Sequence, residues 1–322
     1  MKLGVFTPVF GHLSTADMIA RVQRFQHVQA VELGTGGWPG RAHLDDLTAL
    51  IDGHCRATTY RQRLADAGLT ISALSCHGNP LHPDPAIAQA DDALFRQTVR
   101  LAAKMQVPTV VTFAGCPGDH AEAKHPNWIT TPWPPEFLAV LDWQWEQKAI
   151  PYWTEAGRFA ADHGVTIALE AHPGFLVYNA DTMLKLRAAT HPAVGLNFDP
   201  SHLFWQGVDI PAAIRAVADC IYHVHAKDLA FDRQNVAVNG VLDTKSYRRL
   251  RERSWLFRSV GWGHDALTWK QIISALRLAG YDHVVSIEHE DALLSVDEGL
   301  AAAVALLAPI VLTEPPAEPW WT

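Results

Sequence analysis

Eight short apolar runs, each followed by a segment whose apolar residues recur at helical spacing, constrain this chain more than any other feature. The apolar runs are 2–7, 29–33, 69–76, 109–113, 165–170, 194–199, 220–225 and 283–288. The helical segments are 16–25, 58–67, 91–105, 143–163, 180–189, 211–217, 269–279 and 296–307. Strict alternation of strand and helix indicates parallel strands, and eight such units close into a (β/α)₈ barrel. We therefore predict an α/β fold, a single-domain TIM barrel over residues 1–312, with a C-terminal extension at 313–322.

A doubly wound sheet is the competing architecture, but no GxGxxG motif follows the first run. The glycines of Gly34-Thr35-Gly36-Gly37 have no helix directly behind them, which is typical of a flexible loop. Two long connections, 114–135 and 228–266, follow predicted strands. Loops of that length in this fold usually cover an active site at the C-terminal face of the barrel.

The composition of the chain indicates which kinds of binding partner to expect. The formal net charge of −8 disfavours binding to a phosphate backbone, so no nucleic acid is expected. The longest apolar run, 299–312, contains Pro309 and is too short to cross a membrane. The first residues lack the apolar core of a signal peptide, and the four cysteines form no CxxC pair. We expect a cytoplasmic protein with reduced cysteines and a small-molecule substrate.

Metal-ligand residue types stand at the ends of four consecutive predicted strands. Strand five ends at Glu170, strand six at Asp199, strand seven at His225 and strand eight at Glu288. Catalytic groups of a TIM barrel come from these strand ends. Converging carboxylates repel one another in a low-dielectric site, and a bound cation removes that cost. The four residues are therefore predicted to hold one divalent metal.

Strand alternation supports the convergence. If Glu170 points into the barrel, Ala168 shares its face while Leu169 points to the helices. The same parity places Asn197 and Ser286 inside the barrel. It also places both His223 and His225 inside, and His225 is preferred as the ligand because it lies nearer the mouth. Three carboxylates and one imidazole favour Mn²⁺, with Mg²⁺, Co²⁺ or Zn²⁺ as alternatives.

These residues resemble the ligand set of the xylose isomerase-like barrels, in particular the sugar phosphate isomerase/epimerase group. The stretches that carry the resemblance are DPSH at 199–202, HVHAKD at 223–228 and SIEHED at 286–291. The resemblance implies a metal-dependent enzyme that acts on a sugar. His202 matches a substrate-contacting histidine of the keto-sugar 3-epimerases, but Leu176 and Phe231 replace their second glutamate and their substrate-binding arginine. The two-glutamate epimerase mechanism is therefore not expected.

Other stretches resemble the large subunits of C-glycoside deglycosidases, which belong to the same barrel superfamily. These are EAHPG at 170–174, NPLHP at 79–83, the PNW–WP loop at 126–134 and DPSHLFWQG at 199–207. That resemblance implies a lyase that eliminates the aglycone from a 3-oxo-glycoside and works with a small partner subunit.

The chain offers several groups for acid–base work and substrate contact. His172 and Lys227 lie two residues past a predicted ligand and share its parity, so either could move a proton. His172 could instead orient a ligand, and Lys227 could instead pair with Asp228. His202 is the third catalytic candidate. Predicted substrate contacts are Glu32, His77, Trp205 and His264.

We interpret the chain as a sugar or keto-sugar isomerase or epimerase that works through an enediolate, with the 3-oxo-glycoside lyase as the alternative. An apurinic-site endonuclease shares the fold but fits the net charge of −8 poorly. A metal-dependent sugar-binding module without turnover is the remaining possibility. A homo-oligomer is expected.

Overall fold

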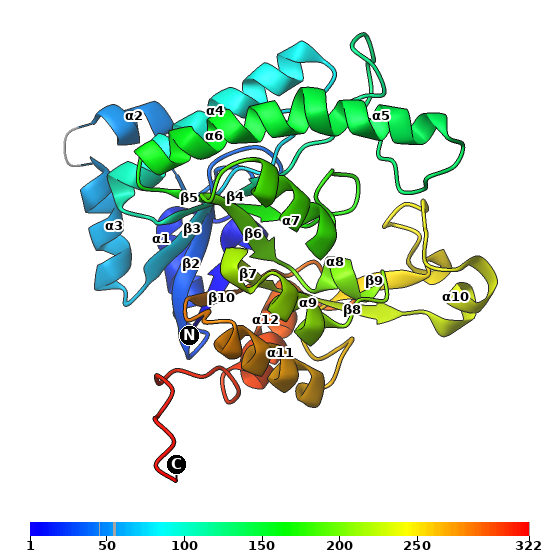
Figure 1. Cartoon of the computed structure of the whole chain (residues 1–322). Helices are drawn as coiled ribbons and strands as arrows, with labels where there is room; N and C mark the ends of the chain where they lie inside the picture. Colours follow the sequence, from blue (N-terminus) through cyan, green and yellow to red (C-terminus); the bar gives the residue numbers. More distant parts are fainter. Residues whose placement is uncertain (45, 54–55, 322) are drawn as a thin grey trace.

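Eight parallel strands close into a barrel in the computed structural model, which describes residues 1–44, 46–53 and 56–321. Around the barrel the strand order is β1-β10-β7-β6-β5-β4-β3-β2 (Figure 1). The barrel strands are β1 Lys2–Phe6, β2 Val28–Gly34, β3 Thr70–Ser75, β4 Thr109–Phe113, β5 Thr166–Glu170, β6 Val194–Phe198, β7 Ile221–Ala226 and β10 Val284–Ile287. The predicted (β/α)₈ barrel is confirmed, with each strand within two residues of its predicted bounds.

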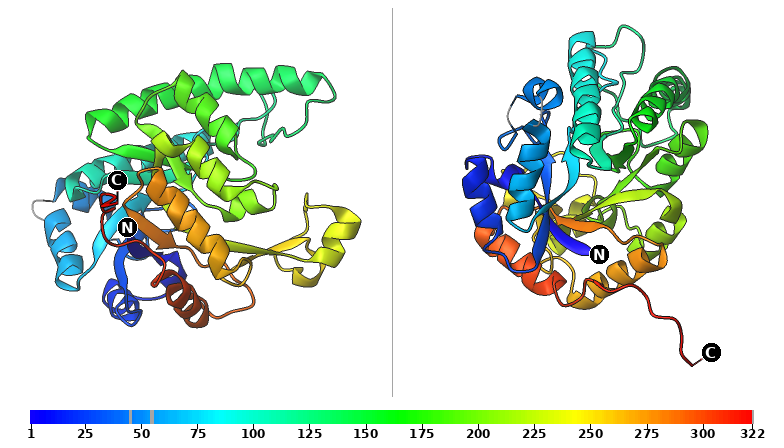
Figure 2. Two further views of the ribbon diagram at one scale, coloured as in Figure 1. Left: turned by 60° about the horizontal axis from the view of Figure 1, so that its bottom comes forward. Right: turned by 90° about the vertical axis from the view of Figure 1, so that its left-hand side faces the viewer.

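Helices surround the barrel, as the end-on view in Figure 2 shows. The long ones are α1 Thr15–Val22, α3 Arg56–Asp66, α4 Pro85–Met105, α6 Ile150–Asp162, α7 Ala180–Ala189, α11 Ala266–Leu278 and α12 Val296–Leu307, and the shorter α9 spans Ile210–Ala216. Their apolar faces pack on the outward side chains of the strands, with Trp153 and Trp269 almost fully buried between the layers. Inside the barrel, small residues such as Ala73 and Ala168 form a separate apolar layer with Val111, which confirms the predicted parity of strand five.

Local sequence explains several helix boundaries. Helices α7 and α12 begin with capping boxes, in which the side chains of Asn179 and Ser295 accept a backbone N–H of the first turn. Before α6, the helix α5 (Glu136–Gln144) passes through a π-helical turn, Trp145–Ala149. Pro151 follows that turn, and since proline has no N–H to continue an α-helical ladder, the wider turn lies where the regular pattern is interrupted.

Short elements fill the connections. Two of them are α2 Leu47–Asp52 and α8 Ser201–Phe204. The region 228–266, which we expected to be a loop, contains an antiparallel pair of strands, β8 Asp228–Phe231 and β9 Trp255–Arg258. Helix α10, Arg233–Asn239, lies between them and buries none of its residues. Residues 228–258, hereafter the arm, project from the barrel (Figure 1).

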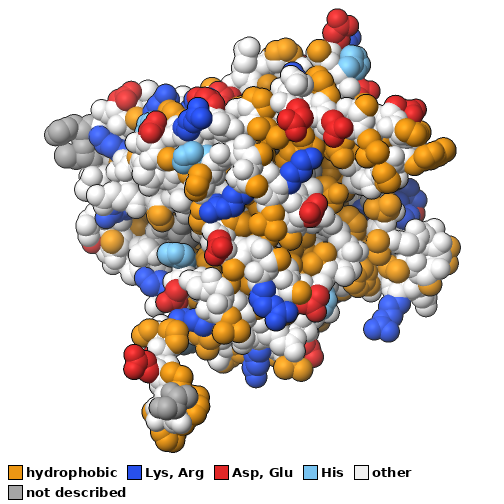
Figure 3. All heavy atoms as spheres, in the orientation of Figure 1, with side chains coloured by type: hydrophobic (Ala, Val, Ile, Leu, Met, Phe, Trp, Pro, Cys, Tyr) orange, Lys and Arg blue, Asp and Glu red, His pale blue; other side chains and the backbone are white. Residues whose placement is uncertain are grey.

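The surface carries interspersed acidic, basic and apolar side chains on the face drawn in Figure 3, where the C-terminal tail stands clear of the barrel. In the part of the chain that the structure describes, no helix combines the length and the apolar character needed to cross a bilayer. Cys76, Cys116 and Cys220 are buried free thiols, as predicted. Cys55 lies outside the described residues.

Candidate active site

Glu170, Asp199, His225 and Glu288 meet at the C-terminal mouth of the barrel. One ligand atom from each lies within 4.8 Å of the others, and all four residues are buried. They stand at or just after the ends of β5, β6, β7 and β10, which are neighbours in the barrel. The structure therefore brings together the four residues predicted as ligands, each from the strand end expected to carry it.

Three of the four offer an atom that makes no hydrogen bond of good geometry, although two of these atoms lie close to the ammonium group of Lys227. Asp199 Oδ2, His225 Nδ1 and Glu288 Oε2 are buried, and within the described residues they make no hydrogen bond. His225 Nδ1 and Glu288 Oε2 are 3.1 Å apart, but their orientation makes no hydrogen bond. Buried polar atoms that lack well-oriented hydrogen bonds are costly. An oxygen-rich set with one imidazole fits a divalent cation, which would satisfy all three atoms.

Lys227 is held by carboxylates. Its Nζ lies 3.1 Å from Asp199 Oδ2, 2.8 Å from Glu288 Oε2 and 3.1 Å from Glu290 Oε2. Burial alone would lower the pKa of Lys227, but the charges of Asp199 and Glu288 outweigh burial and raise it well above its usual value. Lys227 is therefore a protonated ammonium group, which can donate a proton or balance negative charge but does not serve as a base.

The proposed pair between Lys227 and Asp228 is wrong. Asp228 turns away and accepts hydrogen bonds from the backbone N–H groups of Gly261, Gly263 and His264, and from His264 Nδ1 at 2.7 Å. Consecutive residues of a strand point to opposite faces. Lys227 therefore faces the mouth, while Asp228 anchors the loop behind it.

Glu170 is fixed by a ring of donors. His77 Nε2 and Asn197 Nδ2 lie 3.0 and 3.1 Å from Glu170 Oε2, and His202 Nε2 lies 3.0 Å from Glu170 Oε1. Burial would raise the pKa of Glu170, but the nearby imidazoles of His202, His225 and His77 outweigh burial and hold that pKa well below its usual value. Burial would likewise lower the pKa of His202, but Asp199 outweighs it and raises that pKa to about 9. His77 and His202 thus both orient the carboxylate of Glu170.

The pKa of His172 shifts in the opposite direction from that of His202. Its Nδ1 lies 2.6 Å from the carbonyl oxygen of Pro173, so Nδ1 carries the proton and Nε2 keeps its lone pair. The ring packs 4.1 Å from the ring of His202 and 4.9 Å from Phe113, measured between centroids. Burial, together with the charge of His202, lowers the pKa of His172 to about 3. The ring is therefore neutral, and Nε2 is the atom of His172 that can accept a proton beside the candidate ligands.

Glu32 lies behind His225 rather than at the mouth. Its Oε2 is 2.9 Å from His225 Nε2 and 2.8 Å from Ser286 Oγ, and Ser75 donates to Oε1. Burial would raise the pKa of Glu32, but His225 and His223 lower it to about 2. We expected Glu32 to contact substrate. Because its oxygens are engaged inside the barrel, we assign it instead to orienting His225.

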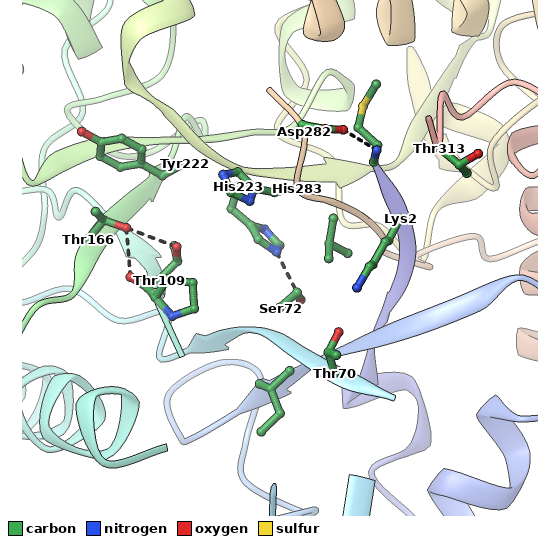
Figure 4. A pocket seen from close by; sticks show the side chains of 14 residues that line it. Lys2, Thr70, Ser72, Thr109, Thr166, Tyr222, His223, Asp282, His283 and Thr313 are labelled. Atoms are coloured by element: carbon green, nitrogen blue, oxygen red, sulfur yellow. Dashed lines mark hydrogen bonds and ion pairs between the residues drawn. The ribbon is translucent and has the colours of Figure 1, made fainter. Parts of the chain in front are cut away.

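His223 lies deeper in the barrel than His225. Its Nδ1 donates to Asn197 Oδ1 at 3.0 Å. His223 also lines a cavity of about 510 Å³, and Figure 4 shows its side chain there beside Ser72, with Lys2 on another part of the wall. This cavity opens among the N-terminal ends of β1 and β3, opposite the mouth. The depth of His223 agrees with the choice of His225 as the candidate ligand.

Two predicted substrate contacts belong to the base of the arm. Trp205 is buried and stacks on Trp255, with ring centroids 5.7 Å apart. His264 is bonded to Asp228 and stacks 3.7 Å from Phe204. These partners give both residues a role in packing the arm against the barrel, and substrate contact by either remains a prediction.

Sequence reasoning missed two residues of the mouth. Glu290 follows Glu288 by two positions, so parity could have placed it beside Lys227. Phe257 comes from β9, and its ring lies 4.7 Å from Lys227 Nζ. No sequence signal pointed to Phe257, because the region 228–266 was read as a polar loop.

Comparison with known proteins agrees with this architecture. The family described as the xylose isomerase-like TIM barrel matches residues 27–309. A Bacillus subtilis protein, "Uncharacterized protein YfiH", is 38% identical over 310 residues, which are 95% of this chain and 98% of that protein. An inosose dehydratase of Clostridium beijerinckii is 38% identical over 77 residues, 24% of this chain and 26% of the enzyme.

Solved structures share the fold at low sequence identity. The IolI protein with a bound zinc atom superposes with a TM-score of 0.63 at 18% identity, covering 97% of this chain and 98% of that one. An L-ribulose 3-epimerase superposes with a TM-score of 0.60 at 18% identity, covering 96% of this chain and 93% of that one. Likeness at this level of identity concerns the fold.

Proposed function

Since the chain belongs to the xylose isomerase-like TIM barrel family, we propose that it is a divalent-metal-dependent enzyme that isomerises or epimerises a sugar or keto-sugar through an enediolate. One observation carries the proposal. Four buried metal-ligand residues converge within 4.8 Å beside a neutral imidazole, His172, and a protonated ammonium, Lys227. A base and an acid at a candidate metal site are the parts that proton transfer next to a carbonyl requires.

Glu170, Asp199, His225 and Glu288 are the residues that would hold the metal, with Mn²⁺ as the proposed ion. The donor set supports this assignment, because three buried carboxylates and one imidazole offer the oxygen and nitrogen ligands that such an ion takes. When bound, the cation would supply Lewis-acid polarisation of a carbonyl or hydroxyl oxygen and would lower the pKa of the adjacent C–H. The IolI structure, which contains zinc, supports a divalent ion in this fold.

Two side chains beside the candidate ligands carry out the proton transfers: His172 as the base and Lys227 as the acid. His172 Nε2 has a free lone pair and takes the proton from the carbon beside the carbonyl, giving the enediolate. Lys227 carries a proton at Nζ and can donate it to a substrate oxygen or stabilise negative charge there. His77 and His202 hold Glu170 in place through hydrogen bonds of 3.0 Å. Phe113 and Phe175 pack beside His172 and limit the access of water to it.

A lyase is the second candidate, and specific residues favour it. The positions where 3-epimerases place a second glutamate and an arginine are occupied by Leu176, which is buried, and Phe231, which lies in the arm. A site with one base suits proton removal followed by loss of a leaving group. The match to an inosose dehydratase supports elimination chemistry. In this form the enzyme would cleave a 3-oxo-glycoside and could require a small partner subunit.

The deciding experiment is a panel of polyols, keto-sugars and 3-oxo-glycosides incubated with Mn²⁺-loaded protein in D₂O and followed by NMR. An isomerase or epimerase gives a rearranged sugar that carries deuterium. A lyase gives free aglycone and an unsaturated keto-sugar. His172→Ala, which keeps the predicted metal ligands, should suppress either reaction. Binding without exchange of any C–H across the panel would instead indicate a sugar-binding module and would overturn the proposal.

A further inference from the structure

An apolar cavity adjoins the candidate active site on the side of the arm. Its volume is about 250 Å³, and its wall includes Tyr247, Leu250, Leu256, Phe257, Glu290 and Leu293. Tyr247 and Leu293 are about half exposed, so the cavity opens to solvent on one side. Glu290 is the one charged residue in this wall.

The cavity shares two residues with the mouth of the barrel. The ring of Phe257 lies 4.7 Å from Lys227 Nζ and 5.4 Å from the ring of His202, measured to ring centroids. Glu290 Oε2 lies 3.1 Å from the same Lys227 Nζ. A substrate placed against the proton donor Lys227 therefore has the apolar cavity as its immediate neighbour.

The wall of the cavity is preformed. Arg253 is buried, and its guanidinium group lies between the rings of Tyr247, at 4.2 Å, and Trp255, at 4.7 Å. That position fixes Tyr247, whose ring stacks on Phe257 with centroids 5.7 Å apart and planes inclined by 19°. Asp243 closes the same loop by accepting the backbone N–H of Ser254 at 2.7 Å. An apolar wall that is already packed in this way can bind a ring with little free-energy cost for ordering the side chains of the protein.

We propose that this cavity binds an apolar, aromatic substituent carried by the sugar, so that the substrate is an aryl-substituted keto-sugar or 3-oxo-glycoside rather than a free sugar. The inference rests on the proposed function for the adjoining mouth, where the sugar itself would lie. A free sugar would leave the cavity empty, and a second sugar ring would place hydroxyls against Leu250, Leu256 and Leu293 without hydrogen-bond partners. A flat ring can instead pack against the apolar wall formed by Tyr247, Phe257 and these leucines.

The test compares ligands that differ only in the substituent. Phenyl and methyl β-D-glucopyranoside, each also in its 3-oxo form, are titrated into Mn²⁺-loaded protein by calorimetry. Removing roughly 100 Å² of apolar ring surface from water predicts tighter binding of the phenyl compounds by about tenfold or more. Leu293→Asp and Tyr247→Ser should abolish this preference. Leu278→Asp should keep it, because Leu278 is exposed on α11, outside the wall of the cavity.

The outcomes separate this inference from the proposed function. Equal affinity for phenyl and methyl compounds, or no binding of either, overturns the aromatic subsite. A phenyl preference that disappears in Leu293→Asp but not in Leu278→Asp supports the subsite, even if no C–H exchange is seen and the proposed reaction fails. Exchange that proceeds equally with both substituents supports the reaction and rejects the subsite.

Discussion

Glu32 Oε2 lies 2.9 Å from His225 Nε2, on the side of the imidazole opposite the Nδ1 atom that approaches Glu288. A carboxylate in this position keeps the proton of His225 on Nε2 and leaves Nδ1 free to bind a cation. Ser75 and Ser286 hold the carboxylate of Glu32 from behind. The relationship explains how a histidine inside a barrel can present a defined nitrogen to the mouth.

Replacing Glu32 by glutamine tests this relationship. Glu32→Gln keeps the shape of the side chain but removes the charge that orients His225. Mn²⁺ affinity should fall by roughly 10–100-fold, as for other partners that orient a metal ligand, and titration calorimetry measures it. Glu122→Gln, at an exposed position, is the control. Unchanged affinity in Glu32→Gln would remove the positioning role.

Alanine variants of the candidate ligands test the metal site itself. Asp199→Ala and Glu288→Ala should each lose bound metal and activity, because each removes one of the four converging ligand atoms. Metal analysis of the purified variants, with circular dichroism to verify folding, gives the result. Loss of metal in His223→Ala but not in His225→Ala would show that the wrong histidine was chosen. Full metal content in both Asp199→Ala and Glu288→Ala would refute the site.

Variants of the residues assigned to proton transfer should lose turnover but keep their metal, unlike the variants of the ligands. His172→Ala should lower turnover by roughly 10²–10⁴-fold, the usual contribution of a general base, while metal content stays unchanged. Lys227→Met should also lower turnover. It should not weaken metal binding, since it removes a cation from within 3.1 Å of Asp199 Oδ2 and Glu288 Oε2. If Lys227→Met loses its metal, Lys227 supports the site structurally. If turnover survives His172→Ala, the assignment of His172 as the base is wrong.

The pH dependence of stability offers a check on the arm. Burial would raise the pKa of Asp243, but the backbone N–H groups of Ser254 and Lys245 outweigh it and lower that pKa to about 2. A depressed carboxyl pKa stabilises the fold above the unfolded value of about 3.9 and loses that effect as pH falls toward 2. The difference in unfolding free energy between the wild type and Asp243→Asn should therefore be constant above about pH 5 and shrink below pH 4, as measured by urea denaturation. A difference that grows with acidity would contradict the assignment.

The sequence predicted the barrel well because every barrel strand alternates between two buried layers. The parity of Glu170, Asn197 and Ser286 followed directly, and the structure places Asn197 and Ser286 inside the barrel, bonded to Glu170 and Glu32. The arm was not predictable in the same way. Its strands pair with each other instead of the barrel, and Arg253 is buried between aromatic rings, a context that a basic run does not reveal.

The partners of Lys227 and Glu32 were also beyond the sequence, for a geometric reason. Adjacency in the chain suggested Asp228 as the partner of Lys227, but neighbouring residues of a strand face opposite ways. The actual partners, Asp199, Glu288 and Glu290, come from other strand ends. Glu32 was predicted to contact substrate, and the sequence did not reveal that its carboxylate faces His225 Nε2.

The last prediction concerns the path of the hydrogen. We expect the reacting hydrogen to leave as a proton, because His172 Nε2 has a free lone pair and the partly buried ring can exchange its proton with solvent. A direct hydride shift between carbons needs no such base. Substrate deuterated at the reacting carbon separates the routes. Washout of the label into H₂O, lost in His172→Ala, supports the proton route. Complete intramolecular retention of the label during turnover, unaffected by His172→Ala, would establish hydride transfer and remove the enediolate from the mechanism.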